Sequence, residues 1–502
     1  MTVRPKIMKV VIVGGGSAGW MAAAMLARLM GSQLDIRLVE SEEIGTVGVG
    51  EATIPTIAHF NKVLGIDEAD FLRATQGTFK LGIQFENWNR PDENFMHAFG
   101  TVGRDLGFTG FHHAWLRARA AGDQSSLWDY SLNYQATRHN LFSTLEKIPN
   151  TPLQGLVHAY HFDAGLYARY LRQLSESWGV TRTEGKILEV NLADETGYID
   201  SVTLASGGII EGDFFIDCSG FRALLIKGAL NIGYEDWHHW LPCDRAIAVA
   251  TSGTTPLVPY TRAIALGAGW QWRIPLQHRT GNGLVYCSDY LNDTDAQGLL
   301  LNNLDAEPLS PPRLLKFVTG RREKQWHKNC VALGLASGFV EPLESTSLHS
   351  VQSGIVRLIK LFPRHEFNDV HVEEFNRQSR IEAERIRDFI ILHYYLNQRP
   401  EPFWKSCREM VVPESLAHKI ELFRHTGTIF REQDELFSEA AWQQVMIGHG
   451  LMPEQYHPLT DALAPGQLQE LLDSLRKIID GTVINMPGHA DFIQGYCRAK
   501  PI

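Results

Sequence analysis

Residues 9–40 read KVVIVGGGSAGWMAAAMLARLMGSQLDIRLVE: a short β-branched run, a cluster of glycines, an Ala- and Leu-rich stretch and a second β-branched run. This order predicts a strand over residues 10–13, a helix over 20–30 and a second strand over 36–39. The turn between the first strand and the helix carries Gly14-x-Gly16-x-x-Gly19, the glycine spacing of dinucleotide-binding β-α-β units. The stretch therefore predicts an α/β protein with a nucleotide-binding sheet.

The glycines of this motif have separate physical roles. The first allows a tight turn, the second lets the backbone approach a pyrophosphate, and the third allows close packing of the helix on the strand. The free N–H groups at the start of the helix favour phosphate, and an acidic residue about twenty residues further on accepts from ribose hydroxyls. The cofactor contacts expected from this region are Gly14, Gly15, Gly16, Ala18, Gly19 and Glu40.

Other interpretations of this stretch are a glycine-rich turn of an unrelated α/β protein and a secretory signal peptide. The central glycines and Arg28 argue against the apolar core of a signal peptide. The motif alone does not distinguish FAD from NAD. FAD is favoured by alternating stretches at 180–220, which predict antiparallel hairpins leading into a strand at 214–216. No second motif for NAD(P)H follows, so a separate protein would have to reduce a flavin bound here.

Composition restricts the function classes. The 502 residues carry a net charge of -10, which argues against a nucleic-acid partner. The hydrophobic fraction of 44% and the charged fraction of 21% are typical of a globular protein without a membrane partner. The six cysteines lie far apart without a C-x-x-C pair, which argues against a metal site and a disulfide framework. A reduced, cytoplasmic protein is the simplest expectation.

The later part of the chain returns to the strand–loop–helix pattern. A strand is expected at 331–335 and a helix from Leu348 to Phe362, followed by a mainly helical region beyond about residue 364. Because the nucleotide-binding signals span more than three hundred residues, we expect a discontinuous FAD-binding domain over 1–90 and 150–362. The mainly helical substrate-binding region is expected over 91–149 and 363–502.

Five stretches together resemble the flavin-dependent tryptophan halogenases: GGGSAGW at 14–20, GVGEATIP at 48–55, FKLG at 79–82, WQWRIP at 270–275 and EPLEST at 341–346. The resemblance covers nearly the whole chain, and the W-x-W-x-I-P stretch is its most specific part. It implies a Rossmann-like, flavin monooxygenase-type fold with a mainly helical substrate-binding subdomain. It also implies further FAD contacts from Gly48, Glu51, Ala52, Leu335 and Leu348.

In the chemistry that this resemblance implies, reduced FAD, oxygen and chloride or bromide give hypohalous acid, which travels to Lys80 beside the organic substrate. The Lys80 ammonium would polarise the oxidant, or the free amine would form a haloamine; the sequence leaves both open. Glu344 would stabilise and deprotonate the cationic ring intermediate, with Glu341 as the second candidate. The backbone amides of Thr346 and Ser347 would bind halide, since Ser345 and Thr346 are suitable N-cap residues before the helix.

Aromatic side chains are expected on both sides of the chemistry. Trp270 and Trp272, two residues apart in a strand, would point to one face and shield the flavin from the organic substrate. His97 and Phe99 match the pair that stacks on indole, and aromatic faces suit a flat, electron-rich ring. Residues 111–113 are as consistent with a structural role as with this wall.

The amino-acid clamps of tryptophan-specific enzymes have no match in residues 430–445. An unpaired zwitterion is costly to bury, so free indole or a substituted indole is favoured over free tryptophan, with a peptide- or carrier-bound substrate as a further alternative. The expected partners are this small aromatic substrate, a separate flavin reductase and, in solution, a second copy forming a homodimer. The main rival function is an FAD-dependent aromatic hydroxylase.

Overall fold

The computed structural model describes residues 7–44, 50–253, 255–364, 367–433 and 435–501. The chain forms two compact units, each discontinuous in sequence. Unit 1 contains residues 1–76, 162–244 and 316–384; unit 2 contains 77–161, 245–315 and 385–502. These boundaries differ from the expected ones: residues 77–90 and 245–315 cluster with unit 2 because their strands belong to its large sheet.

Unit 1 is built on a six-stranded sheet with the order β20-β21-β12-β1-β2-β8. Its five strands from β21 to β8 are parallel, and β20 is antiparallel to β21. Their bounds are β1 Lys9–Val13, β2 Asp35–Glu40, β8 Thr181–Glu184, β12 Phe214–Asp217, β20 Trp326–His327 and β21 Cys330–Ala332. A parallel sheet needs both faces covered, which explains the continuous apolar runs in β1 and β12.

Helices and small sheets cover this sheet within unit 1. Helix α1 (Ser17–Met30) packs against β1 and β2 and against α6 (Ala164–Ser177) and α8 (Ser347–Lys360). Val11 and Phe215 pack in one core with apolar residues of β9 (Ile187–Leu192), β10 (Ile199–Leu204) and β11 (Ile209–Glu211). The other elements of unit 1 are α2 Thr56–Leu64, α3 Glu68–Thr75, β3 Glu51–Ala52, β13 Tyr234–Asp236, β19 Gly320–Arg322 and β22 Gly338–Phe339.

Most predicted elements of unit 1 are confirmed. Strands β1, β2 and β12, the antiparallel pairing of β9, β10 and β11, and helix α8 occur where the patterns place them. Helix α1 begins at Ser17, three residues earlier than expected, with Gly16 as its N-cap. The strand expected at 331–335 ends at Ala332, and Gly334, with φ of 63°, opens a 3₁₀ turn, η5 (Gly334–Ala336).

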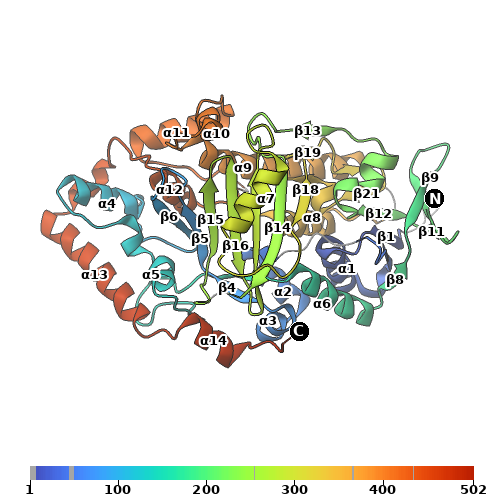
Figure 1. The fold of residues 1–502 in the computed structure, drawn as a ribbon, viewed down its shortest axis with the longest axis horizontal. Helices are drawn as coiled ribbons and strands as arrows, with labels where there is room; N and C mark the ends of the chain where they lie inside the picture. The colour runs from blue at the N-terminus through green and yellow to red at the C-terminus, as the bar shows by residue number, and fades with distance from the viewer. Residues whose placement is uncertain (1–6, 45–49, 254, 365–366, 434, 502) are drawn as a thin grey trace. The chain divides into compact units, whose positions relative to one another are not determined.

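Unit 2 contains a seven-stranded sheet with the order β18-β14-β17-β16-β15-β5-β6. Its bounds are β5 Gly82–Glu86, β6 Asn94–Ala98, β14 Arg245–Ser252, β15 Thr261–Leu266, β16 Gly269–Pro275, β17 Arg279–Tyr286 and β18 Arg313–Lys316. Helix α7 (Asp293–Asn302) covers one face of this sheet (Figure 1). Its Ala296 and Leu300 share a core with Ile247 and Leu284. Of these strands, only β6 falls in the segments expected to be mainly helical; the other six fall in segments expected to belong to the FAD-binding domain.

The chain beyond residue 364 is helical, as expected. The long helix α9 (Asp369–Tyr395) runs from unit 1 into unit 2. In unit 2, the strand β4 (Thr78–Lys80) pairs with β7 (Ala159–Phe162). The remaining helices of unit 2 are α4 Phe111–Ala120, α5 Leu132–Arg138, α10 Pro402–Arg408, α11 Glu414–Thr426, α12 Glu439–Gly448, α13 Pro465–Val483 and α14 His489–Tyr496.

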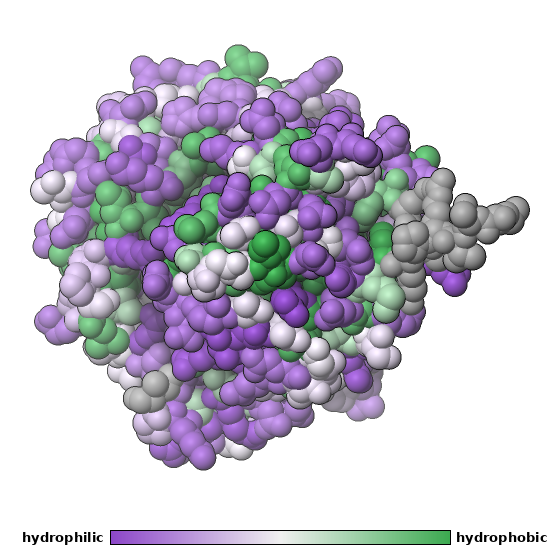
Figure 2. All heavy atoms as spheres, turned by 90° about the vertical axis from the view of Figure 1, so that its right-hand side faces the viewer, coloured by the Kyte–Doolittle hydropathy of each residue, from purple (hydrophilic) through white to green (hydrophobic). Residues whose placement is uncertain are grey.

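The surface is mainly polar on the face drawn in Figure 2, where hydrophobic residues gather only in small groups. Among the described helices, none has the length and apolar character required to cross a membrane. All six cysteines are free thiols. In the described ranges, no cluster of His, Cys, Asp and Glu has the arrangement of a metal site.

Candidate active site

The glycine turn of unit 1 has the geometry that its sequence predicts. Gly14 adopts φ of 113°, and a Cβ there would lie 2.2 Å from the backbone oxygen of Cys218. A Cβ on Gly19 would lie 1.9 Å from the Gly14 oxygen, so the close packing of α1 needs this glycine. At Gly16 a Cβ would meet no protein atom within 4 Å. The second glycine therefore borders open space, as required where a pyrophosphate approaches the backbone.

Glu40 ends β2 beside this turn. Its Oε2 lies where a Cβ on Gly15 would be, 1.4 Å from that position, so Gly15 leaves room for the carboxylate. Its Oε1 accepts a hydrogen bond of 2.5 Å from Arg182 Nε. Arg182 thus holds the carboxylate beside Gly15, where a ribose would lie. These features fit a dinucleotide such as FAD.

The other expected FAD contacts are distributed around unit 1. Ala18 lies in the first turn of α1, where it approaches Gly334 of η5. Leu335 is half-buried in η5, not in a strand, and Leu348 is buried in the first turn of α8. Glu51 and Ala52 form β3. Gly48 lies outside the described residues.

Both candidate carboxylates of unit 1 are buried. Glu341 and Glu344 have no solvent exposure; Glu341 directly precedes the 3₁₀ turn η6 (Pro342–Glu344), and Glu344 is its last residue. Ser345 follows with φ of 59°, which is a left-handed backbone conformation. This conformation is unfavourable in free energy for any residue other than glycine, and it occurs often at functional sites. Ser345 and Thr346 alone separate Glu344 from the start of α8 at Ser347.

The start of α8 presents backbone N–H groups. The helix begins at Ser347, and Thr346 occupies the N-cap position without a side-chain capping bond. Ser345 was also expected to cap the helix; that prediction is wrong, because its left-handed backbone lies one residue before the N-cap. The first turn carries no acidic side chain, so the positive end of the helix dipole remains available to an anion.

Lys80 is fully buried in β4 of unit 2. Its neighbour Phe79 points to the other face of the strand, where it stacks on Phe142 with ring centroids 4.0 Å apart. The Lys80 Nζ lies 5.3 Å from the centroid of the Phe99 ring, within the range of a cation–π interaction. A hydrogen bond of 2.9 Å from the Phe99 N–H to the Leu81 oxygen fixes this arrangement.

His161 lies across from Thr78 on the neighbouring strand β7, two residues from Ala159, which is the partner of Lys80, and it has no exposure. Its Nδ1 is 3.0 Å from the Thr78 hydroxyl, which donates to the Pro275 oxygen, so Nδ1 carries the proton. Its Nε2 accepts from the Thr261 hydroxyl at 2.9 Å. Burial, and then the charge of Lys80, hold the pKa of His161 well below 6.5. The charge of Lys80 thus acts on a ring that stays neutral.

The two motif tryptophans point to one face of β16, as predicted. Trp272 lies opposite Ala263 on β15 and Gly283 on β17, and a Cβ at Gly283 would be 2.0 Å from the Trp272 ring. Trp270 lies opposite Ala265. The small residues on both sides of Trp272 leave room for its indole, whereas Trp270 lies opposite Val285 on β17. Thr261, the partner of His161, points to this same face, since it is two residues from Ala263.

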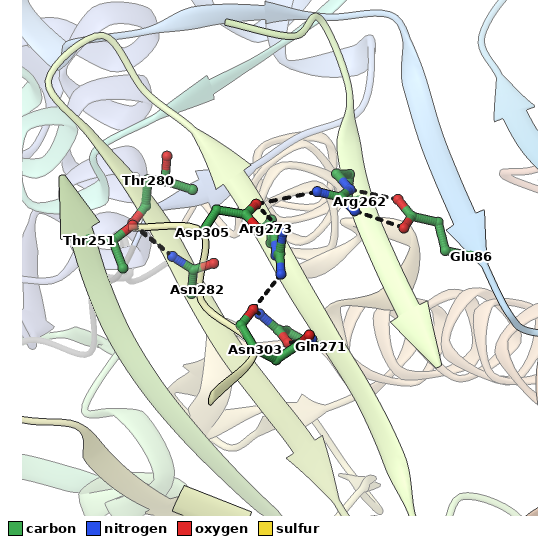
Figure 3. Close-up of polar contacts among 9 residues, drawn as sticks. All are labelled: Glu86, Thr251, Arg262, Gln271, Arg273, Thr280, Asn282, Asn303 and Asp305. Carbon is green, nitrogen blue, oxygen red and sulfur yellow. Dashed lines mark hydrogen bonds and ion pairs between the residues drawn. The ribbon is translucent and has the colours of Figure 1, made fainter. Parts of the chain in front are cut away.

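The opposite face of β16 carries a chain of charges (Figure 3). Arg273 lies directly across from Arg262, and Asp305 forms ion pairs with both guanidinium groups. Arg262 also binds Glu86 of β5 through two hydrogen bonds of 2.6 and 2.8 Å. The two like charges are therefore compensated, and the network ties β16 to β15 and β5. It borders a polar cavity of about 630 Å³.

The expected stacking pair belongs to a larger aromatic cluster in unit 2. The His97 ring lies 6.4 Å from Phe99, 5.7 Å from Phe389 and 6.2 Å from Phe437. Phe389 stacks on Phe437 with centroids 3.7 Å apart and meets Trp442 edge-on at 4.7 Å. We call these five residues the aromatic wall. Sequence reasoning identified two of them; the other three come from α9, α12 and the loop before α12.

The segment expected to lack amino-acid clamps contains a buried carboxylate. Glu435 is 2% exposed and forms an ion pair with Lys419 at 2.8 and 2.9 Å. It also accepts from the Trp442 indole N–H at 2.8 Å. Its acceptor capacity is therefore used inside the protein. The sequence offered no signal for this pair, since Lys419 lies on α11, sixteen residues away.

Residues 111–113 have structural contacts. His112 of α4 hydrogen bonds to the Gly427 oxygen, and the His457 N–H donates to His113. Burial lowers the pKa of His113 to about 3. These histidines connect α4 to the loops that follow α11 and α12.

The fold and these sites define a class of protein. Unit 1 has the parallel sheet and the glycine turn of a dinucleotide-binding enzyme, and unit 2 has a buried lysine beside an aromatic wall. Residues 9–465 match the sequence profile of the tryptophan halogenase family. The chain belongs to this family, and it is an FAD-dependent halogenase by class.

Relatives and solved structures are similar over nearly their full lengths. The tryptophan 6-halogenase of Streptomyces toxytricini is 36% identical, with 94% of this chain and 96% of the relative covered. A flavin-dependent halogenase from Xanthomonas campestris is 48% identical, with a TM-score of 0.96 over 99% of this chain and 100% of that chain. A flavin-dependent halogenase from a Brevundimonas species is 46% identical, with a TM-score of 0.94 and coverage of 98% and 100%.

Proposed function

We propose that this enzyme halogenates an indole ring that does not carry a free amino-acid group, using Lys80 to deliver the halogen. The observation that carries the proposal is the placement of Lys80. Its ammonium is buried, faces Phe99 and lies at one end of the aromatic wall. An aromatic substrate stacked on this wall would lie beside a lysine that bulk water does not reach.

The residues of unit 1 supply the complementary roles. Glu344 is the base that stabilises and removes the ring proton after halogen addition, because a buried carboxylate acts strongly on a developing cation. The Thr346 and Ser347 amides bind chloride or bromide at the start of α8. Glu341, equally buried, is the second candidate for the base.

FAD is held by the glycine turn, Glu40, Glu51, Ala52, Leu335 and Leu348. When bound in its reduced form, FAD would give two electrons to oxygen, and the same oxygen molecule would take two more from halide, so that hypohalous acid and water form. Trp270 and Trp272 keep the organic substrate away from the flavin. A separate flavin reductase supplies the reduced cofactor, since the only motif of the chain that suits a dinucleotide is the one at 14–19.

The preference for indole rests on Glu435. A free carboxylate in this segment would suit the ammonium of tryptophan, but Glu435 is neutralised by Lys419 and hydrogen-bonded by Trp442. A tryptophan zwitterion would enter without compensation for its lost hydration. Each missing charge-assisted hydrogen bond costs roughly 1.5–3 kcal/mol, so two such losses correspond to about a hundredfold or more in relative binding.

The test is mass spectrometry of indole and tryptophan, each incubated with the enzyme, FAD, a flavin reductase, NADH and bromide or chloride. We expect a larger kcat/KM for indole, with halogen mainly at C3, the most electron-rich carbon. Omission of the reductase should abolish the product. Steady NADH oxidation by the enzyme alone, with hydroxylated product, would support an aromatic hydroxylase instead. A preference for tryptophan would show that another group clamps the zwitterion.

A Glu344→Gln variant separates the base from the production of oxidant. We expect product formation to fall by about a hundredfold, because proton removal loses its acceptor. Hypohalous acid released from the enzyme should remain at the wild-type level. A parallel loss of hypohalous acid would assign Glu344 to the flavin side of the reaction.

A further inference from the structure

Strand β6 carries His97 and lies at the edge of the seven-stranded sheet, so its outer backbone groups have no neighbouring strand in that sheet. Ala98 pairs with Gly82 on the inner side, and the Phe99 N–H donates to the Leu81 oxygen there. The N–H and C=O of Ala98, the residue between His97 and Phe99 in the chain, point outward from the sheet edge. Buried backbone groups at such a position need partners from elsewhere.

Gln444 of helix α12 supplies both partners. Its Oε1 accepts from the Ala98 N–H at 3.1 Å, and its Nε2 donates to the Ala98 oxygen at 3.1 Å. The side-chain amide thus reproduces the two hydrogen bonds that an additional antiparallel strand would make. Gln444 is 1% exposed, so water does not compete for these bonds.

A second contact, one helical turn further along α12, supports the same docking. A Cβ on Gly448 would lie 2.3 Å from the Phe95 ring, so the helix approaches β6 closely at this point. Residues four apart lie on one face of a helix, so Gln444 and Gly448 together seat α12 on β6. The same helix carries Trp442, which meets Phe389 in the aromatic wall.

We infer that Gln444 is a positioning residue for the aromatic substrate: it locks the strand of His97 and Phe99 to the helix of Trp442 and thereby sets the spacing of the aromatic wall. This inference rests on the proposed role of that wall in substrate binding. Gln444 does not touch the reacting atoms. A displacement of about 1 Å in a positioning element is enough to cost catalysis up to a hundredfold.

The test uses Gln444→Glu, which changes one amide nitrogen to oxygen. As a carboxylate, the new side chain still accepts from the Ala98 N–H but repels the Ala98 oxygen. As a neutral acid it donates to that oxygen again, and burial favours the neutral form. We expect kcat/KM for indole to fall about tenfold at pH 8 and to recover relative to wild type at pH 6. Gln444→Met should lose activity similarly without recovery.

The matched control is Gln443→Glu, which adds the same charge one residue away at a half-buried position of α12. The titratable groups His97 of β6, Glu439 of α12 and His449 after α12 are present in every variant, so their titration cancels in the ratio to wild type. We expect this control to follow the wild type at both pH values. A recovery that also occurs in Gln443→Glu would overturn the inference.

Two further measurements separate positioning from stability. Hypohalous acid release should be the same in Gln444→Glu as in the wild type. Exchange of the Ala98 amide hydrogen at pH 8 should be faster in Gln444→Glu than in the wild type at the same pH. Gly448→Ala, which displaces the same interface from its second contact, should also lower kcat/KM. Unchanged kcat/KM in Gln444→Glu with faster Ala98 exchange would overturn the inference. If the wild type releases hypohalous acid but halogenates no indole, the proposed function fails. The exchange rate of the Ala98 amide would still show whether Gln444 holds β6 against α12.

Discussion

The glycine turn of unit 1 and the aromatic wall of unit 2 are built in opposite ways. The turn uses the backbone of consecutive residues, and each glycine is explained by an atom that its missing Cβ would meet or leave room for. The wall uses side chains from β6, α9, α12 and two loops, separated by hundreds of residues in the chain. A site formed by the backbone can therefore be predicted from a local motif, whereas a pocket formed by side chains depends on how distant elements pack.

Lys80 gives the sharpest test, because it lies at the wall and not at the turn. Lys80→Ala should lower halogenation by about a thousandfold, since the group that receives the oxidant is removed. FAD affinity, measured by quenching of flavin fluorescence, should be unchanged. Retained halogenation would show that Lys80 does not deliver the halogen. Lost FAD binding would show that the glycine turn and the aromatic wall are not independent.

The buried ion pair between Lys419 and Glu435 is expected to contribute strongly to stability. Lys419→Met leaves Glu435 buried without its counter-charge, which should lower the free energy of unfolding by about 3–5 kcal/mol. Adding Glu435→Gln should restore much of the loss. The control is Lys405→Met, which removes an exposed ion pair with Glu409 and should change little. Chemical denaturation measures all three; equal effects of the two lysine changes would contradict a structural role for Glu435.

In the glycine turn, substitutions at two glycines three residues apart should behave differently. Gly16→Ala meets no protein atom, so the melting temperature of the FAD-free protein should be unchanged while FAD binds about tenfold more weakly. Gly19→Ala places a Cβ against the Gly14 oxygen, so it should lower the melting temperature as well. Unaltered FAD affinity in Gly16→Ala would mean that the cofactor does not approach this backbone.

The smallest expected effect concerns His489, which is fully buried in unit 2. Its Nε2 accepts from the Phe79 N–H at 3.3 Å, and burial lowers its pKa to about 4. An unfolded histidine binds a proton below about pH 6.5, whereas this one stays neutral, so folding stability falls as pH decreases from 6.5 towards 4. The contribution is about 1.4 kcal/mol per pH unit.

His489→Gln preserves a donor and an acceptor but does not titrate. Denaturation at pH 7, 6 and 5 should therefore show a shallower loss of stability in this variant. His161 and His113 act in the same direction and remain, so part of the slope persists. An identical slope in the two proteins would show that folding does not lower the pKa of His489.

The sequence by itself determined the nucleotide-binding sheet, the glycine turn and the orientation of Trp270 and Trp272. These features follow from local periodicity and from backbone conformations that only certain residues adopt, so neighbouring positions are sufficient to predict them. The resemblance to a family then selected Lys80 and Glu344, which composition and spacing alone would not have distinguished from other lysines and glutamates.

Only the tertiary structure decided which side chains surround Lys80. It placed the neutral His161 beside Lys80, completed the aromatic wall with Phe389 and Phe437, and neutralised Glu435 with Lys419. It also assigned residues 245–315 to the sheet of unit 2 and Ser345 to a left-handed turn. These outcomes depend on contacts between residues far apart in the chain, whose packing and charge pairing leave no periodic pattern in the sequence.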